Sequence, residues 1–326
     1  MHVKKTPNSV KNSRFLPYHK TPLIRSTRLA KETPRIKRTD FGDICNKTWQ
    51  SYLSTALNQF KCDEHSLKKY SKLLTEWVQS KLMRGSASKD NSSFKAEFTC
   101  KSDQYSTTVF ITLKGSSLNY RQHSLKNRAS YNAQTYFSAV MHSINGNPDT
   151  SLMDESQSMW FPVLLANGAV FTTNQVLEFM METFDCVISE LHFASHELEW
   201  MVALWQNVSE EEMGTKSLDL IYSISKQEIS KIRYSLNVDN VNKLWDAIHG
   251  KQSNEVVLSE VKKLFEQLKQ HFYFMFRINL DKLKLAAVGT PVLTANQNGK
   301  IKIFAEDEVG QILQHIISLN PLTLFS

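Results

Sequence analysis

Apolar residues recur every three to four positions through much of the chain, which is the spacing of one face of an α-helix. The first such stretch carries Leu67, Tyr70, Leu74, Trp77 and Val78, and the spacing continues upstream through Trp49, Leu53 and Leu57. The same spacing follows Asn174 and covers residues 195–206, 241–248, 257–268 and 309–317. These segments are predicted to be the helices of the fold.

Alternation of apolar and polar residues predicts strands, because successive strand residues point to opposite faces of a sheet. Residues 109–113, 283–285 and 301–303 alternate in this way, and Asn296–Gly299 is a turn signal before the last of them. Residues 272–280 alternate too, with Tyr273, Met275, Arg277 and Asn279 on the polar side. Because some strands follow one another without a helix between them, we expect an α+β fold with a largely antiparallel sheet.

The 326 residues are enough for one large domain or two modest ones. Residues 1–40 hold eleven lysines and arginines against two acids and contain four of the eight prolines. The formal net charge of this segment is +9 against +7 for the whole chain, so all the excess positive charge lies here. The segment cannot bury enough surface to order itself. We expect a disordered basic arm over residues 1–40, a helical segment over 41–84 and an α+β domain over 94–326.

Motifs for common enzyme classes are missing. The ten glycines form neither a dinucleotide fingerprint nor a P-loop, and the four cysteines form no CxxC pair. His192 and His196 lack the intervening glutamate of a zinc protease, and Cys62 and His65 have no second ligand pair at zinc-finger distance. Cys186 reads as a buried thiol. We expect no enzyme activity, no metal and no cofactor, and no window is apolar enough for a membrane span.

Cations lie two residues apart in three predicted strands, a spacing that puts both on one face. These pairs are Lys231 with Arg233, Lys282 with Lys284, and Lys300 with Lys302. Two interpretations are open: lysine is an ordinary choice for a solvated strand face, and a shared basic face would contact neighbouring phosphates of DNA. The basic arm would add affinity that falls with salt, and Arg35, Lys37 and Arg38 also resemble a nuclear-import signal.

Several blocks resemble the centromere protein L family. Leu164–Gly168 and Thr183–Cys186 are similar to its central block, and Leu67–Leu74 to its upstream helix. Lys243–Asp246 resembles a short tryptophan helix, and residues 271–280 and Gly299–Ile303 resemble two late strands. The likeness spans roughly residues 45–315, with poor agreement over the arm and over 85–160.

This resemblance implies a non-enzymatic subunit of the inner kinetochore, in the nucleus at the centromere. It implies a curved, saddle-like sheet with packed helices and a heterodimer with centromere protein N, beside subunits H, I, K, M and C. It also implies a role in holding the centromeric nucleosome and DNA during chromosome segregation. By family analogy only Lys300 and Lys302 lie in a matching motif; the other four cations rest on the pattern alone.

The aromatic strand predicted over residues 272–280 would be an aggregation hazard at a sheet edge unless a partner covered it. We assign Tyr273, Met275 and Arg277 to a partner interface, in which this strand, or the strand predicted at Leu283–Val288, pairs with the partner's sheet by strand addition. A central strand buried on both faces is an open alternative. A general chromatin- or RNA-binding protein with a basic tail, or a cryptic enzyme on an α+β scaffold, are the alternative functions.

Overall fold

The computed structural model describes residues 41–85, 93–103, 106–116, 134–144, 158–206, 217–224, 230–249 and 256–319. The predicted arm over residues 1–40 lies outside these ranges. In the described part of the chain, the fold is α+β, as the sequence predicts.

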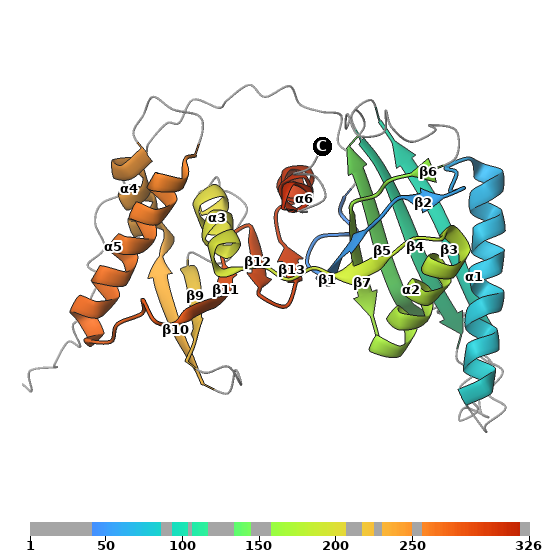
Figure 1. Cartoon of the computed structure of the whole chain (residues 1–326), viewed down its shortest axis with the longest axis horizontal. Helices are drawn as coiled ribbons and strands as arrows, with labels where there is room; N and C mark the ends of the chain where they lie inside the picture. The colour runs from blue at the N-terminus through green and yellow to red at the C-terminus, as the bar shows by residue number, and fades with distance from the viewer. Residues whose placement is uncertain are drawn as a thin grey trace, which may run out of the picture. The chain divides into compact units, whose positions relative to one another are not determined.

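Six α-helices occur in the described ranges (Figure 1). They are α1 (Glu64–Gly85), α2 (Val170–Phe184), α3 (Ser195–Trp205), α4 (Val238–His249), α5 (Leu258–Phe276) and α6 (Val309–Ser318). A short 3-10 turn, η2 (Glu306–Glu308), leads into α6. Acidic side chains fix several helix starts: Asp63 accepts the Ser66 amide at 2.9 Å, and Glu260 accepts the Val257 amide at 3.1 Å.

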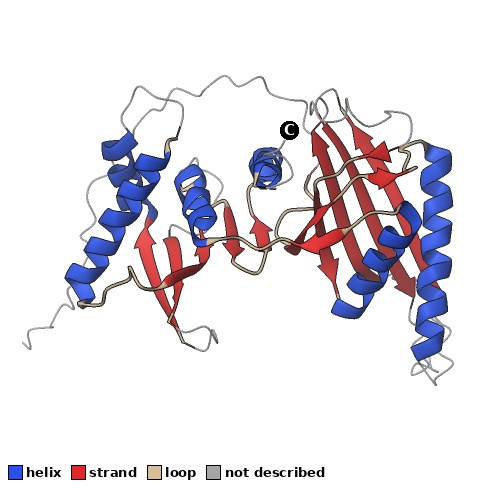
Figure 2. Ribbon diagram, in the orientation of Figure 1, coloured by secondary structure: helices blue, strands red, loops and turns tan. Residues whose placement is uncertain are grey.

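The strands form one antiparallel sheet of 11 strands and a separate pair (Figure 2). The bounds are β1 (Thr48–Ser54), β2 (Leu57–Asn58), β3 (Ser93–Ser102), β4 (Ser106–Ser116), β5 (Gln134–Ile144), β6 (Ser158–Met159), β7 (Val163–Gly168), β8 (Ile188–Glu190), β9 (Ser217–Ser223), β10 (Lys231–Asn237), β11 (Lys284–Gly289), β12 (Leu293–Asn296) and β13 (Lys300–Ile303). The order is β10-β9-β11-β12-β13-β1-β7-β5-β4-β3, with β8 against β1, and β2 pairs with β6.

Two hydrophobic cores lie on opposite faces of this sheet, and β7 belongs to both. Val163 and Leu165 join the core beneath α3, α4, α5 and α6, whereas Leu164 and Ala166 join the core beneath α1 and α2. All four side chains are buried, so β7 is apolar on both faces. This explains why its sequence shows no alternation, as is typical of a central strand covered on both sides.

The edge strand β3 is covered by side chains of α1. Ser71 Oγ accepts the Phe98 amide and Thr75 Oγ1 accepts the Ala96 amide, each at 2.9 Å, and Gln79 Nε2 donates to the Phe94 carbonyl at 3.3 Å. Four residues of a helix rise about 6 Å along its axis, and two residues of a strand rise about 6.8 Å. Side chains four residues apart on α1 can therefore bind every second residue of β3. The two hydroxyls thereby bind backbone amides of β3 that would otherwise be free to pair with a strand of another molecule.

At the middle of the sheet, one edge of β1 changes partner. Thr48–Gln50 pairs with β13, and Tyr52–Ser54 pairs with β8. Ser51 lies at the change: its amide donates to the Gly299 carbonyl at 2.9 Å, and its carbonyl accepts the Leu191 amide at 3.0 Å. Gly299 has a φ of +75°, a conformation that glycine adopts without strain.

The structure corrects two predicted elements. The helix predicted through Trp49, Leu53 and Leu57 is wrong, because this segment forms β1 and β2. The strand predicted over residues 272–280 is also wrong, because α5 continues to Phe276 and ends where Arg277 adopts a left-handed φ of 58°. The other predicted helices and the strands at 109–113 and 301–303 are confirmed. The domain boundaries at residues 40, 84 and 94 stay predictions.

Candidate nucleic-acid and partner interfaces

Strand register places five of the six predicted DNA-contacting cations on one face of the sheet. Opposite residues of an antiparallel pair point to the same face. Ser223 of β9 lies between Lys231 of β10 and Lys284 of β11, which forms one row across three strands. Arg233 shares this face with Lys231 because the two are separated by one residue in β10.

A second row reaches β13. Ser235, Asp219, Gly289, Thr294 and Lys302 are successive opposite residues of β10, β9, β11, β12 and β13. Lys302 therefore lies on the same face as Lys231, Arg233 and Lys284, and Lys300 joins them along β13. The buried residues that alternate with this row, such as Leu220 and Ile301, pack into the core beneath α3 to α6. We call the exposed side formed by Lys231, Arg233, Lys284, Lys300 and Lys302 the basic face.

The sixth cation, Lys282, does not fit the predicted pattern. It lies in the turn before β11, which begins at Lys284, so the strand spacing does not apply to it. Its side chain is exposed, and its predicted DNA contact stays a prediction.

One carboxylate partly neutralises the basic face. Asp219 Oδ2 accepts a hydrogen bond from Arg233 Nη2 at 3.3 Å, and Asp219 also accepts one from the Ser235 hydroxyl. Lys302 Nζ lies 5.1 Å from the centre of the Phe304 ring. Lys284 and Lys300 are exposed and have no acidic partner within 4 Å among the described residues. Lys284 and Lys300 are therefore better placed than Arg233 to meet an anion.

The end of α5 exposes a continuous run of large apolar side chains. Tyr273 is 50% exposed and Met275 46%, as a partner interface requires. Phe274, Phe276 and Ile278, which the strand prediction put on the opposite face, are exposed as well. We call these five residues the aromatic end of α5.

Arg277, the third predicted interface residue, stops the helix beside this surface. Its amide donates to the Tyr273 carbonyl at 2.8 Å, and its guanidinium lies 5.6 Å from the centre of the Phe274 ring. The aromatic end therefore carries one exposed cation stacked on an aromatic ring. An apolar run of this kind, rimmed by polar groups, is typical of a protein contact.

The aromatic end lies next to strand β10, which ends the sheet order. Phe272 of α5 is buried with its ring centre 4.8 Å from that of Tyr234 on β10. The Ile224 amide donates to the Ser230 carbonyl, so these two residues form a hydrogen-bonded pair just outside β9 and β10. Along an antiparallel ladder, hydrogen-bonded pairs alternate with pairs whose backbone groups point away from each other. This alternation directs the backbone groups of Arg233 and Ser235 away from β9, toward the edge of β10 that no described strand covers.

Reactive groups in the described residues give no sign of catalysis. All four cysteines are free thiols, and burial raises the pKa of Cys186, which agrees with the predicted buried thiol. His192 and His196 are both exposed. No three His, Cys, Asp or Glu side chains gather as a metal site in the described ranges. Among those ranges, no helix has the length and apolar character needed to cross a bilayer.

Comparison with known proteins gives one consistent result. A sequence profile of the family described as Centromere protein L matches residues 43–319. Centromere protein L of Xenopus tropicalis is 25% identical over 94% of this chain and 87% of its own length. The proteins of the same name from Rattus norvegicus and Homo sapiens are 27% and 26% identical, each over 85% of this chain and 79% of their own. The chain therefore belongs to the centromere protein L family, and it is a chromosomal protein of the centromere and kinetochore.

Proposed function

We propose that this protein is a non-enzymatic scaffold subunit of the inner kinetochore. In this role it forms a heterodimer with centromere protein N and helps to bind the centromeric nucleosome and its DNA. The single observation that carries the proposal is the exposed aromatic end of α5 beside the edge of β10, which no strand of the described ranges covers. Family membership supplies the setting, namely kinetochore assembly and chromosome segregation.

The partner surface combines two kinds of contact. The backbone groups of Arg233 and Ser235 offer hydrogen bonds to an added strand, and the aromatic end offers apolar area beside it. Tyr and Phe are enriched at protein interfaces, and truncation of a hot-spot residue near the centre of an interface weakens a complex by about 2 kcal/mol or more. The opposite edge, β3, is less suited to strand addition because Ser71 and Thr75 already bind its amides.

The DNA surface uses a different part of the sheet. Lys300 and Lys302 are two residues apart, about 7 Å along the strand, so the pair can reach neighbouring phosphates of one DNA strand. Lys284 adds a cation from another strand of the same face. These side chains read no base edges, so the contact is independent of DNA sequence. Contacts with the inner-kinetochore subunits H, I, K, M and C are part of the proposal through the family alone.

Co-expression with centromere protein N tests this proposal. We expect the two chains to co-elute as a 1:1 complex in size-exclusion chromatography and to shift a DNA duplex in a salt-dependent manner. Each chain alone is the control in both experiments. Separate elution of two folded chains would contradict the heterodimer, and a shift that salt does not weaken would contradict the phosphate contact.

A general chromatin- or RNA-binding role is the alternative, since the basic face would suit any polyanion. A fluorescently tagged copy distinguishes the two. Restriction of the tag to centromeres supports the kinetochore role, and an even distribution over chromatin supports the alternative.

A further inference from the structure

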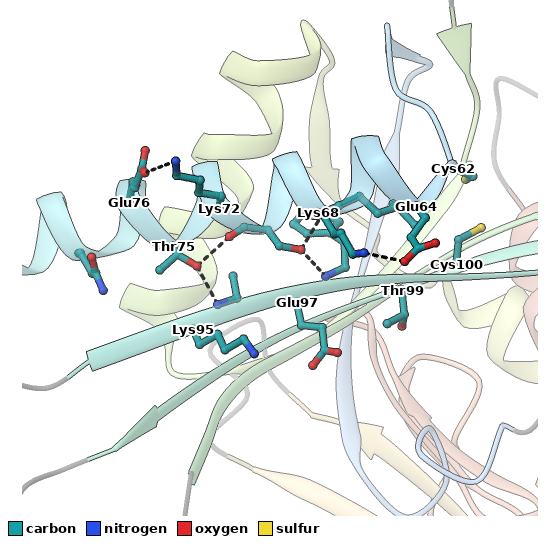
Figure 3. Close-up of a pocket in the computed structure, with 15 residues that line it drawn as sticks. Cys62, Glu64, Lys68, Lys72, Thr75, Glu76, Lys95, Glu97, Thr99 and Cys100 are labelled. Atoms are coloured by element: carbon teal, nitrogen blue, oxygen red, sulfur yellow. Dashed lines mark hydrogen bonds and ion pairs between the residues drawn. The ribbon is translucent and has the colours of Figure 1, made fainter.

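Cys62 and Cys100 lie at one end of the groove between α1 and β3 (Figure 3), and a third sulfur atom, that of Met159, contacts Cys62 there. Cys62 precedes α1, Cys100 lies on β3 and Met159 lies on β6. Cys62 Sγ is 3.7 Å from Met159 Sδ. Figure 3 shows the side chains of Cys62 and Cys100 at the same end of the groove. Both cysteines line the groove, and all three residues are partly exposed, so a solute can reach the cluster.

The donor set matches one class of metal ion. Thiolate and thioether sulfurs are soft ligands that select Cu(I) over the harder divalent cations. A metal–thiolate bond is about 2.3 Å long, so three sulfurs in a trigonal arrangement lie about 4 Å apart. The observed 3.7 Å between Cys62 and Met159 is already close to that separation. Zinc fits less well, because it prefers four ligands and no third His, Cys, Asp or Glu joins the two cysteines in the described ranges.

Both thiols must lose their protons to act as thiolate ligands, so metal binding by this pair is coupled to proton release. Binding of one Cu(I) by both thiols releases two protons and leaves a complex with one negative charge, without any change in oxidation state.

We propose that Cys62, Cys100 and Met159 form a binding site for one soft monovalent cation of the Cu(I) class. Cys62 and Cys100 act as thiolate ligands and Met159 as a thioether ligand. The site ties the segment before α1 to β3 and to the β2–β6 pair. It is independent of the partner and DNA surfaces described above.

The test uses the full chain, reduced and kept free of oxygen. Cu(I) is supplied as its coloured complex with bicinchoninate, and loss of that colour measures transfer to the protein. We expect one Cu(I) per chain. Met159→Leu keeps the side-chain size and should weaken binding at least about tenfold, and Cys62→Ser or Cys100→Ser should weaken it more than about 100-fold. Cys45→Ser is the matched control, since Cys45 is also a partly exposed free thiol.

Each outcome has a consequence for the site. Absence of competition by the unmodified chain would overturn the proposal, as would one-to-one binding that survives replacement of both Cys62 and Cys100. An equal loss in Cys45→Ser would show nonspecific thiol binding and would also overturn it. Circular dichroism of every variant checks the fold. If a cysteine variant unfolds, the comparison between the unmodified chain and Met159→Leu decides, because equal affinity of these two would exclude the thioether ligand.

Discussion

Gly299 faces the carbonyl oxygen of Leu191 so closely that a Cβ added to Gly299 would lie 1.9 Å from that oxygen. Gly299 also has a positive φ, and its carbonyl accepts the Ser51 amide where β1 changes partner. We therefore expect Gly299→Ala to lower the free energy of unfolding by more than about 3 kcal/mol. Urea denaturation measures the change.

Gly310→Ala is the control for this prediction. Gly310 lies in α6, where an added Cβ would meet only Phe41, at 4.0 Å. Alanine favours the helix there by up to about 1 kcal/mol, so this variant should be neutral or more stable. Similar stability of the two alanine variants would contradict the prediction, because it would show that the backbone moves Leu191 away from the added Cβ of residue 299 at little cost in free energy.

Loss of the hydroxyls on α1 should uncover the β3 edge. Ser71→Ala and Thr75→Val each leave one buried amide of β3 without its partner, which costs about 1–2 kcal/mol. The double variant should also self-associate, because an uncovered edge pairs with other strands. Ser80→Ala removes an exposed hydroxyl of the same helix and should change neither property. Urea denaturation and analytical ultracentrifugation measure the two effects, and a monomeric double variant would contradict the edge role.

Charges placed in the aromatic end of α5 should prevent binding of centromere protein N. Tyr273→Glu with Met275→Lys removes apolar area and buries two charges at the contact, so we expect affinity to fall more than about 30-fold. Leu258→Lys is a matched control at the other end of α5, where Leu258 is 49% exposed. Isothermal titration calorimetry measures the affinity. An intact complex with the folded double variant would exclude this surface.

Charge reversal on the basic face should weaken DNA binding. Lys284→Glu with Lys300→Glu removes two phosphate contacts, so the slope of log affinity against log salt should fall by about 2. Arg233→Ala should change the slope less, because the Arg233 guanidinium already forms an ion pair with Asp219. Lys243→Glu, an exposed site on α4, is the control for net charge. Fluorescence anisotropy at several salt concentrations measures the slope, and an unchanged slope would rule out these contacts.

Buried His142 should make the fold sensitive to acid. Burial lowers its pKa to about 4 from an ordinary value near 6.5, and its Nδ1 is hydrogen-bonded to Thr108 Oγ1 at 2.9 Å. Between those pH values the unfolded chain binds the extra proton, so the stabilisation present above pH 6.5 is lost as pH falls toward 4. The loss is at most about 3 kcal/mol.

His142→Gln removes this titration while keeping a polar side chain beside Thr108. Chemical denaturation between pH 7 and 4 should show a shallower pH dependence in this variant than in the unmodified chain. His192→Gln alters an exposed histidine and should leave the curve unchanged. Parallel curves for the unmodified chain and His142→Gln would refute the assignment.

The sequence predicts the amphipathic helices well and fails where one spacing fits two structures. Trp49, Leu53 and Leu57 are four residues apart, which suits a helix face but is also a multiple of the strand period. Residues 272–276 are aromatic at nearly every position, so no period is present, and packing of Phe272 on Tyr234 favours the helix. The end of α5 cannot be predicted from the sequence either, because the left-handed residue that ends it is Arg277 and not a glycine.

Site prediction shows the same limit. The pairs at Lys231 and at Lys300 are correct within their strands, but only the register across β9 to β13 brings them onto one face. The strand spacing does not apply to Lys282, because β11 begins two residues later, at Lys284. The sulfur cluster joins residues far apart in the chain, so no local sequence motif predicts it.

The sheet is narrowest where β12 and β13 have four residues each, and only three residue pairs join β13 to β1. A kinetochore protein that transmits tension would carry part of it through this joint. Short ladders yield at lower force than the ten-residue ladder between β3 and β4. Pulled from both ends, the chain should therefore open first between β13 and β1, beside Gly299, and leave the core beneath α1 and α2 folded.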